Sequence, residues 1–222
     1  ELNERLDDRL GPLSTPEALL PDRHRAMRAS IDWSYELLTG EQQWFFRQLG
    51  VLQSGFVLDT LEGLFGGAVE VLELTEALVD QNLVQRGGFR RDPDRLSMLE
   101  SVRQYALEQL ERQDELAAMQ ERHARYYASL VLAKHADQRS FDAEAIEQFK
   151  PELGDLRQSI LWLAEHDLDR ATEMAAGAWR IWFVAGQIRD ADLWLDVVLN
   201  AISDRQSVDR VRAMYGRAIM RS

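Results

Sequence analysis

Residues 96–110 constrain the fold most strongly, because the spacing of their apolar side chains changes partway along the stretch. Leu96 and Met98 alternate with a serine, as the buried side of a strand does. From Leu99 onward, apolar residues recur every three or four positions as far as Leu110, which places them on one face of a helix. The stretch therefore predicts a short strand that runs directly into an amphipathic helix, at the join between two parts of the chain.

The residues before this join predict compact helices followed by a hairpin. Helices are expected at about 24–38, after Thr39, at 59–65 and at 70–81. Thr39 and Gln42 have the spacing of a capping box, which predicts that a helix begins after the threonine. A hairpin with a glycine-bearing turn at 87–95 comes next. This order predicts a winged helix-turn-helix over residues 23–112, with 70–81 as the recognition helix and 87–95 as the tip of the wing.

The residues after the join predict an almost continuous series of helices. These are expected at about 101–112, 115–137, 143–150, 152–165, 168–185, 190–202 and 206–221. The pair on either side of Gly186 has the short turn and the small-plus-aromatic pattern of a helical-hairpin repeat. The chain is therefore expected to be mainly α. Flanking the winged helix, we predict the end of a preceding helical domain and a linker at 1–22, bridging helices at 113–150, and the start of a tetratricopeptide-like superhelix at 151–222.

Tryptophans are concentrated in the predicted repeats, where Trp179, Trp182 and Trp194 allow two interpretations. Rings that lie three or four residues apart share one face of a helix, which is typical of a repeat core. Aromatic rings also dominate binding hot spots, so the same tryptophans are candidates for a partner groove. Core and groove are both open for each ring.

Three separated motifs resemble one family of bacterial regulators. LSMLESVRQYA, which begins at residue 96, is similar to LLETVRQYA of the LuxR-type and SARP-type regulators. These belong to the signal-transducing ATPases with numerous domains (STAND proteins), whose ATPase domain is NB-ARC-like. RHRAMRASIDWSYELL, which begins at residue 23, is similar to that family's RHRTLRAALDWSYDLL, and RLDDR at residue 5 has the expected position. The resemblance spans nearly the whole chain.

The resemblance implies a nucleotide-binding domain upstream in a longer parent chain. This chain has no GxxxxGK motif, so ATP or ADP is expected to bind the parent, and no cofactor is expected here. In the wider family, the histidine of a Met-His-Asp triplet contacts the nucleotide. The matching residues are Met98, Leu99 and Glu100, and a leucine cannot donate a hydrogen bond. Leu99 is therefore a sensor position with a core role as its alternative, and Arg23 and His24 are substitute candidates near the nucleotide.

The function that we expect from these patterns is a non-catalytic regulatory module. The winged helix would restrain the nucleotide domain, and a protein or small-molecule inducer on the repeats would shift the population of an open state. A scaffold without a nucleotide switch is a further alternative, because Leu99 replaces the histidine.

The charge of the chain bears on DNA as a partner. The formal net charge is −12, and the predicted recognition helix carries acidic side chains without lysine or arginine. Phosphate contacts dominate affinity for nucleic acid, so this pattern disfavours DNA binding through this chain. The wing nevertheless carries a cluster of arginines. The alternative function is therefore a DNA-binding transcription factor that uses Arg86, Arg90, Arg91 and Arg95.

Other functional classes have little support in the sequence. There is no cysteine, and the four histidines are widely separated, which disfavours a metal site. A GxSxG nucleophile motif is absent, so we predict no catalytic residues. No run approaches the roughly 20 apolar residues of a membrane span, and the first residues do not read as a signal peptide. A cytoplasmic protein without a membrane partner is expected.

Overall fold

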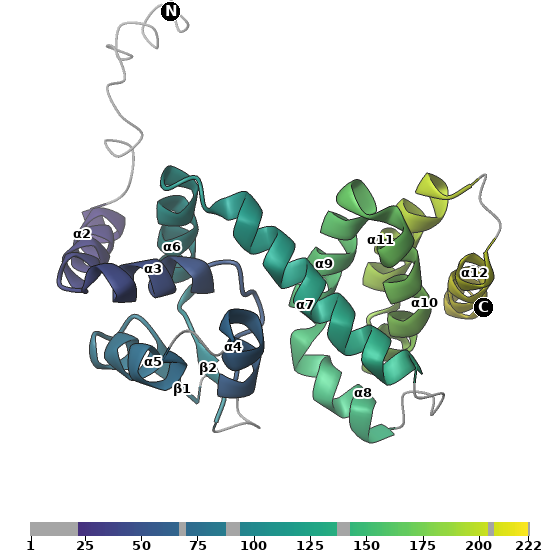
Figure 1. The fold of residues 1–222 in the computed structure, drawn as a ribbon, viewed down its shortest axis with the longest axis horizontal. Helices are drawn as coiled ribbons and strands as arrows, with labels where there is room; N and C mark the ends of the chain where they lie inside the picture. The colour runs from purple at the N-terminus through teal and green to yellow at the C-terminus, as the bar shows by residue number, and fades with distance from the viewer. Residues whose placement is uncertain (1–21, 67–69, 88–93, 137–142, 204–206, 222) are drawn as a thin grey trace, which may run out of the picture.

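The computed structural model describes residues 22–66, 70–87, 94–136, 143–203 and 207–221 (Figure 1). Its first helices are α2 (Asp22–Glu36), α3 (Gly40–Leu49), α4 (Leu58–Phe65) and α5 (Val71–Asp80), followed by strands β1 (Gln85–Arg86) and β2 (Leu96–Ser97). The later elements are α6 (Glu100–Arg112), α7 (Leu116–Ala136), α8 (Ala143–Phe149), the 3-10 turn η2 (Lys150–Glu152), α9 (Leu153–His166), α10 (Leu168–Ala185), α11 (Ile188–Ala201) and α12 (Val208–Arg221). The described part of the chain is mainly α with one small antiparallel hairpin, as the sequence predicted.

Within the predicted range 23–112, we use the name winged helix for the unit of α3, α4, α5 and the hairpin. The predicted capping box is confirmed at the start of α3: the Thr39 hydroxyl accepts from the Gln42 N–H, and the Gln42 side chain accepts from the Thr39 N–H. In the hairpin, Gln85 pairs with Ser97 and Arg86 with Leu96. Gly87 follows β1 with a φ of 76°, which glycine adopts without the strain that a side chain brings.

The strand-to-helix join exists as predicted but is shorter. Leu96 exchanges two backbone hydrogen bonds with Phe56, at 2.7 and 2.8 Å, so β2 is also fixed to the segment before α4. The strand ends at Ser97, and Leu99 is the extended N-cap of α6 and is 52% exposed. A core role for Leu99 is therefore wrong, because the residue lies outside the helix whose apolar face it was expected to share.

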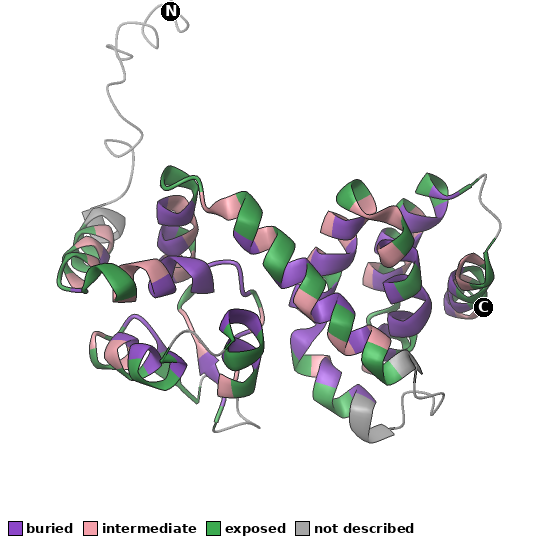
Figure 2. Ribbon diagram, viewed as in Figure 1, coloured by how far each residue is buried: buried purple, intermediate pink, exposed green. Residues whose placement is uncertain are grey.

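The long helix α7 connects the winged helix to the later helices (Figure 1). It packs against α4 and also against α9 and α10. Helix α10 in turn contacts α9, α11 and α12, and Figure 2 shows that most of it is buried. Gly216 allows α12 to approach α10 closely, since a Cβ there would lie 2.6 Å from the Trp179 ring. The tetratricopeptide-like assignment of these helices stays a prediction.

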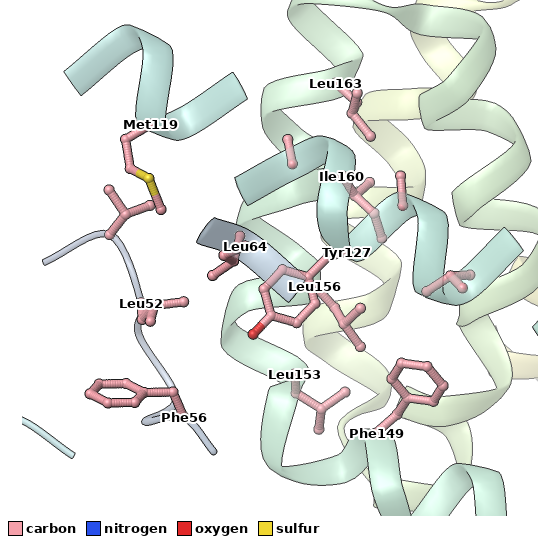
Figure 3. Packing of buried hydrophobic residues seen from close by; sticks show 14 of the residues in the cluster. Leu52, Phe56, Leu64, Met119, Tyr127, Phe149, Leu153, Leu156, Ile160 and Leu163 are labelled. Carbon is pink, nitrogen blue, oxygen red and sulfur yellow. The ribbon is translucent and has the colours of Figure 1, made fainter. Parts of the chain in front are cut away.

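One continuous apolar cluster extends through the described helices, from Ile31 in α2 to Met220 in α12. In α2, Ile31 is buried, whereas Met27 one turn earlier is 41% exposed. Figure 3 shows the part of the cluster in which Leu52 and Leu64 of the winged helix lie near Tyr127 and Leu156 of the later helices. The predicted domain boundaries stay predictions, and the segment 1–21 lies outside the described residues.

Gly50 provides a test of the packing of α3 on α6. A Cβ at this position would lie 2.8 Å from the backbone nitrogen of Leu107, which cannot move without shifting the helix. We expect Gly50→Ala to lower the free energy of unfolding by about 1–3 kcal/mol, as overpacking does. Gly40→Ala is the matched control, because a Cβ there has nothing within 4 Å. Urea denaturation of both variants checks this, and equal stabilities would contradict the described helix contact.

Candidate functional site at the joint between the wing and the later helices

The two wing arginines that the structure describes differ in their exposure to solvent. Arg86 is exposed, and its guanidinium lies 3.9 Å from the Glu76 carboxylate of α5. Arg95 is only 3% exposed, so its place differs from that of a surface contact. Arg90 and Arg91 lie outside the described residues.

Arg95 links the hairpin to the later helices through a set of buried hydrogen bonds. Its Nε donates to the carbonyl of Ser54 and its Nη2 to the carbonyl of Gly55, each at 3.0 Å. The same Nη2 lies 2.7 Å from Oε1 of Glu152, the last residue of η2. The other carboxylate oxygen of Glu152 accepts from the Tyr127 hydroxyl of α7 at 2.9 Å. The guanidinium thus joins the base of the wing to two helical elements.

Asp155 makes a second connection from the first turn of α9. Its two oxygens accept from the backbone N–H groups of Gln53 and Ser54, at 2.8 and 2.9 Å. One of them also lies 2.9 Å from Nε2 of His123 in α7. With its proton on Nε2, His123 donates to Asp155, and its Nδ1 accepts from Ser159 at 3.3 Å. Asp155 is completely buried, and a carboxylate in a first turn is also favoured by the helix dipole.

These residues form what we name the joint: Arg95, Glu152, Tyr127, Asp155, His123 and Ser159, together with the backbone of 53–55. Gly154 allows α9 to approach the backbone of 53–55 closely, because a Cβ at this position would lie 2.8 Å from the Ser54 hydroxyl. The joint is therefore the place where the winged helix is attached to the later helices by directional bonds.

The electrostatics of the joint follow from its burial. Desolvation raises the pKa of the Glu152 carboxyl above its ordinary value, although Arg95 acts in the opposite direction. Desolvation also raises the pKa of the Tyr127 phenol well above its ordinary value, so the hydroxyl stays protonated and donates to Glu152. Separating the two sides would leave buried charges and donors without partners, which is strongly unfavourable unless water reaches them. The joint therefore resists separation of the winged helix from the later helices.

Helix α5, which the sequence predicts as the recognition helix, presents carboxylates to solvent. Glu73, Glu76 and Asp80 are all exposed, as is Glu70 just before the helix. Its buried side chains, among them Leu74 and Leu78, face the core. Helix α5 has no lysine or arginine, the cations that base-reading helices use, and its exposed carboxylates repel phosphate.

The tryptophans assigned to a groove or a core lie in the core. Trp182 is completely buried and Trp194 is 1% exposed, while Trp179 is 8% exposed and touches Tyr215 of α12 edge-on. The Trp182 ring lies 4.9 Å from the Trp194 ring, and its indole N–H donates to Asp190 at 2.9 Å. These placements agree with the core interpretation rather than with a partner groove.

Arg23 and His24 lie in the first turn of α2, and their side chains are outside the described ones. Leu99 is exposed at the start of α6, next to Glu100 and Arg103, which form an ion pair at 2.7 Å. Arg103 also donates to the carbonyl of Gly50, so it ties α6 to the end of α3.

Sequence reasoning missed most of the joint. Glu152, Asp155 and Ser159 follow one another at helical spacing, so they form a polar stripe on the same side as the apolar Leu156. His123 lies four residues before Tyr127, which is also a signal of a shared face. Polar residues within apolar stripes of two helices could have indicated a buried network, but not its partner on the wing.

The part of the chain that the structure describes contains neither a metal-ligand cluster nor a membrane-spanning helix. No group of three or more histidine or carboxylate side chains among the described residues is arranged to hold a metal ion. None of the described helices combines the length and the apolar character that a membrane span requires.

Comparison with known proteins gives three similar proteins, one from Mycobacterium bovis and two from strains of Mycobacterium tuberculosis. Each carries the description "Putative HTH-type transcriptional regulator" and is 30% identical over 204 residues, which is 90% of this chain. The chain spans only 23% of the length of these relatives. No family model and no solved structure matches the chain.

Proposed function

We propose that this chain is a non-catalytic regulatory module of a cytoplasmic transcriptional regulator, in which the winged helix is an internal contact and not a reader of DNA. The observation that carries the proposal is the burial of Arg95 against Glu152. A wing arginine that reads DNA must be exposed, whereas this one connects the wing to the later helices. The described relatives, all named as transcriptional regulators, support the general role.

The surface charge supports the same proposal. The helix in the recognition position exposes carboxylates, and the exposed Arg86 lies near one of them. Binding of DNA would require that surface to approach phosphates at a separation where like charges repel. A surface of this kind is better suited to a protein partner with basic groups.

In the longer parent chain, we propose that the winged helix packs on an upstream nucleotide-binding domain that holds ATP or ADP. The resemblance of residues 23–38 and 96–106 to STAND regulators supports this, as does the small share of the relatives that the chain covers. An inducer on the helical repeats would then favour one of two arrangements through its differential affinity. The joint is the element that would transmit the change, because it touches both parts.

The second candidate function is direct DNA binding by the wing. The names of the relatives as HTH-type transcriptional regulators favour it, and Arg86 is exposed on the hairpin. In that case the wing, and not α5, would supply the phosphate contacts.

Fluorescence anisotropy of this chain with a labelled generic DNA duplex, at low and then moderate salt, separates the two candidates. The proposal predicts no binding at either salt concentration. Binding that weakens steeply with salt, and that falls further in Arg86→Glu, would overturn it in favour of the wing. A variant with Glu73→Lys and Glu76→Lys is the positive control, since it removes part of the acidic surface and is expected to gain salt-sensitive binding.

A further inference from the structure

A pocket of about 770 Å³ opens between α4, α7 and the segment formed by α8 and η2. Its inner wall is formed by the buried residues Thr60, Tyr127, Phe149 and Glu152. Figure 3 shows Tyr127 and Phe149 in the apolar cluster from which this wall is built. The volume is within the range of about 300–1,000 Å³ that small-molecule sites have.

The mouth of the pocket is exposed to solvent, whereas its inner wall is buried. Leu130 is half-buried there, while Ala133 and Lys134, which lie on the next turn of α7, are exposed. The pocket therefore combines an apolar body with polar groups at its two ends, as ligand sites commonly do.

The charges of the pocket indicate which ligand it fits. Glu152 already uses one carboxylate oxygen for Arg95 and the other for Tyr127, so its charge is compensated inside the protein. Lys134 has no ion-pair partner among the described residues. Such a cation at the mouth, above an apolar wall, complements a single negative charge on the outer end of an apolar molecule.

We propose that this pocket binds a small amphipathic monoanion, with its apolar body against Tyr127, Phe149 and Leu130 and its anionic group at Lys134. The ligand would contact α4 of the winged helix and α7 of the later helices at once. It would also lie against Glu152 and Tyr127, which belong to the joint. A ligand that touches both sides of the joint favours the joined arrangement by its differential affinity.

Binding of the anion to the pocket does not depend on the proposed function. The regulatory effect of that binding rests on the proposed function. The two can fail separately, because the DNA assay does not involve the pocket. A chain that binds DNA and also binds the anion would retain the pocket and lose the regulatory proposal.

The test is a fluorescence titration with 8-anilinonaphthalene-1-sulfonate, an aromatic monoanion that becomes fluorescent when its rings are buried. Ala133→Trp places a large ring at the mouth of the pocket. Ser129→Trp is the matched control, because Ser129 is exposed on the same helix but lines a different surface depression. Lys134→Glu reverses the charge without filling the pocket. Circular dichroism and urea midpoints confirm that each variant folds.

We expect saturable binding at one site in the unaltered chain, at least tenfold weaker in Ala133→Trp and at least threefold weaker in Lys134→Glu. Ser129→Trp should stay within twofold. Equal affinity in Ala133→Trp and the unaltered chain would overturn the proposal, as would binding that Lys134→Glu leaves unchanged. If Ala133→Trp does not fold, Lys134→Glu decides the result on its own.

Discussion

Replacing Arg95 with methionine is expected to lower the free energy of unfolding by about 3–5 kcal/mol at neutral pH, because it leaves Glu152 buried without its ion partner. The carbonyls of Ser54 and Gly55 lose their donors in the same step. Methionine keeps most of the side-chain length, so loss of packing is a minor part of the effect. Urea denaturation measures the change.

Arg86→Met is the matched control on the same hairpin. Arg86 is exposed, and its ion pair with Glu76 is long, so this variant should change stability by no more than about 0.5 kcal/mol. The double variant Arg95→Met with Glu152→Met is expected to recover much of the loss, since replacing both members of a buried pair with apolar groups is often neutral. Similar stabilities for Arg95→Met and Arg86→Met would show that Arg95 does not hold the joint.

The effect of Arg95→Met should depend on pH in a defined direction. Burial raises the pKa of Glu152 in the folded state, and Arg95 lowers it, so loss of the arginine raises that pKa further. When the pKa of a carboxyl is higher in the folded than in the unfolded state, the protein becomes less stable as the pH rises from the unfolded-state pKa to the folded-state pKa. The difference in stability between Arg95→Met and the unaltered chain is therefore largest at neutral pH and shrinks toward pH 4.5, the ordinary value for glutamate. A difference that grows on acidification would contradict this.

Asp155→Asn is expected to lower the free energy of unfolding by about 2–4 kcal/mol while keeping the shape of the side chain. The carboxylate accepts from two backbone N–H groups and from His123, and an asparagine offers one acceptor oxygen and a competing donor. At least one buried donor is then left without a partner, and each costs about 1–3 kcal/mol.

Glu73→Gln is the control for Asp155→Asn, because Glu73 is an exposed acid on α5. We expect it to stay within about 0.5 kcal/mol of the unaltered chain. If thermal and urea unfolding show equal losses for the two variants, the hydrogen bonds of Asp155 do not stabilise the fold.

The helices could be predicted from the sequence because their signals are local. Each expected range lies within two residues of an observed helix at both ends where both are described, and the capping box at Thr39 is present. Apolar periodicity and caps act over a few residues, so they survive without knowledge of the fold. The hairpin was predictable for the same reason, although the strands are only two residues long.

The candidate site was not predictable, because its bonds join residues far apart in the sequence. Arg95 looked like one of several wing arginines, and nothing near it indicates that its partner is Glu152, 57 residues later. Asp155 likewise accepts from Gln53, 102 residues earlier. Leu99 was misplaced for a different reason: its apolar spacing continues the α6 stripe, but the helix begins only after it. Apolar periodicity indicates which side of a helix a residue lies on, but it does not indicate which distant residue packs against that side.

The joint holds the winged helix to the later helices through the hydrogen bonds of Asp155 and Arg95. Hydrogen exchange followed by mass spectrometry tests it most directly, in peptides from α3 to α5 and from α9 to α11, for the unaltered chain and for Asp155→Asn. We predict that both regions open with the same free energy in the unaltered chain. In Asp155→Asn, α3 to α5 should open at a lower free energy than α9 to α11. Independent opening of the two regions in the unaltered chain, or an identical response of both to the substitution, would contradict the claim.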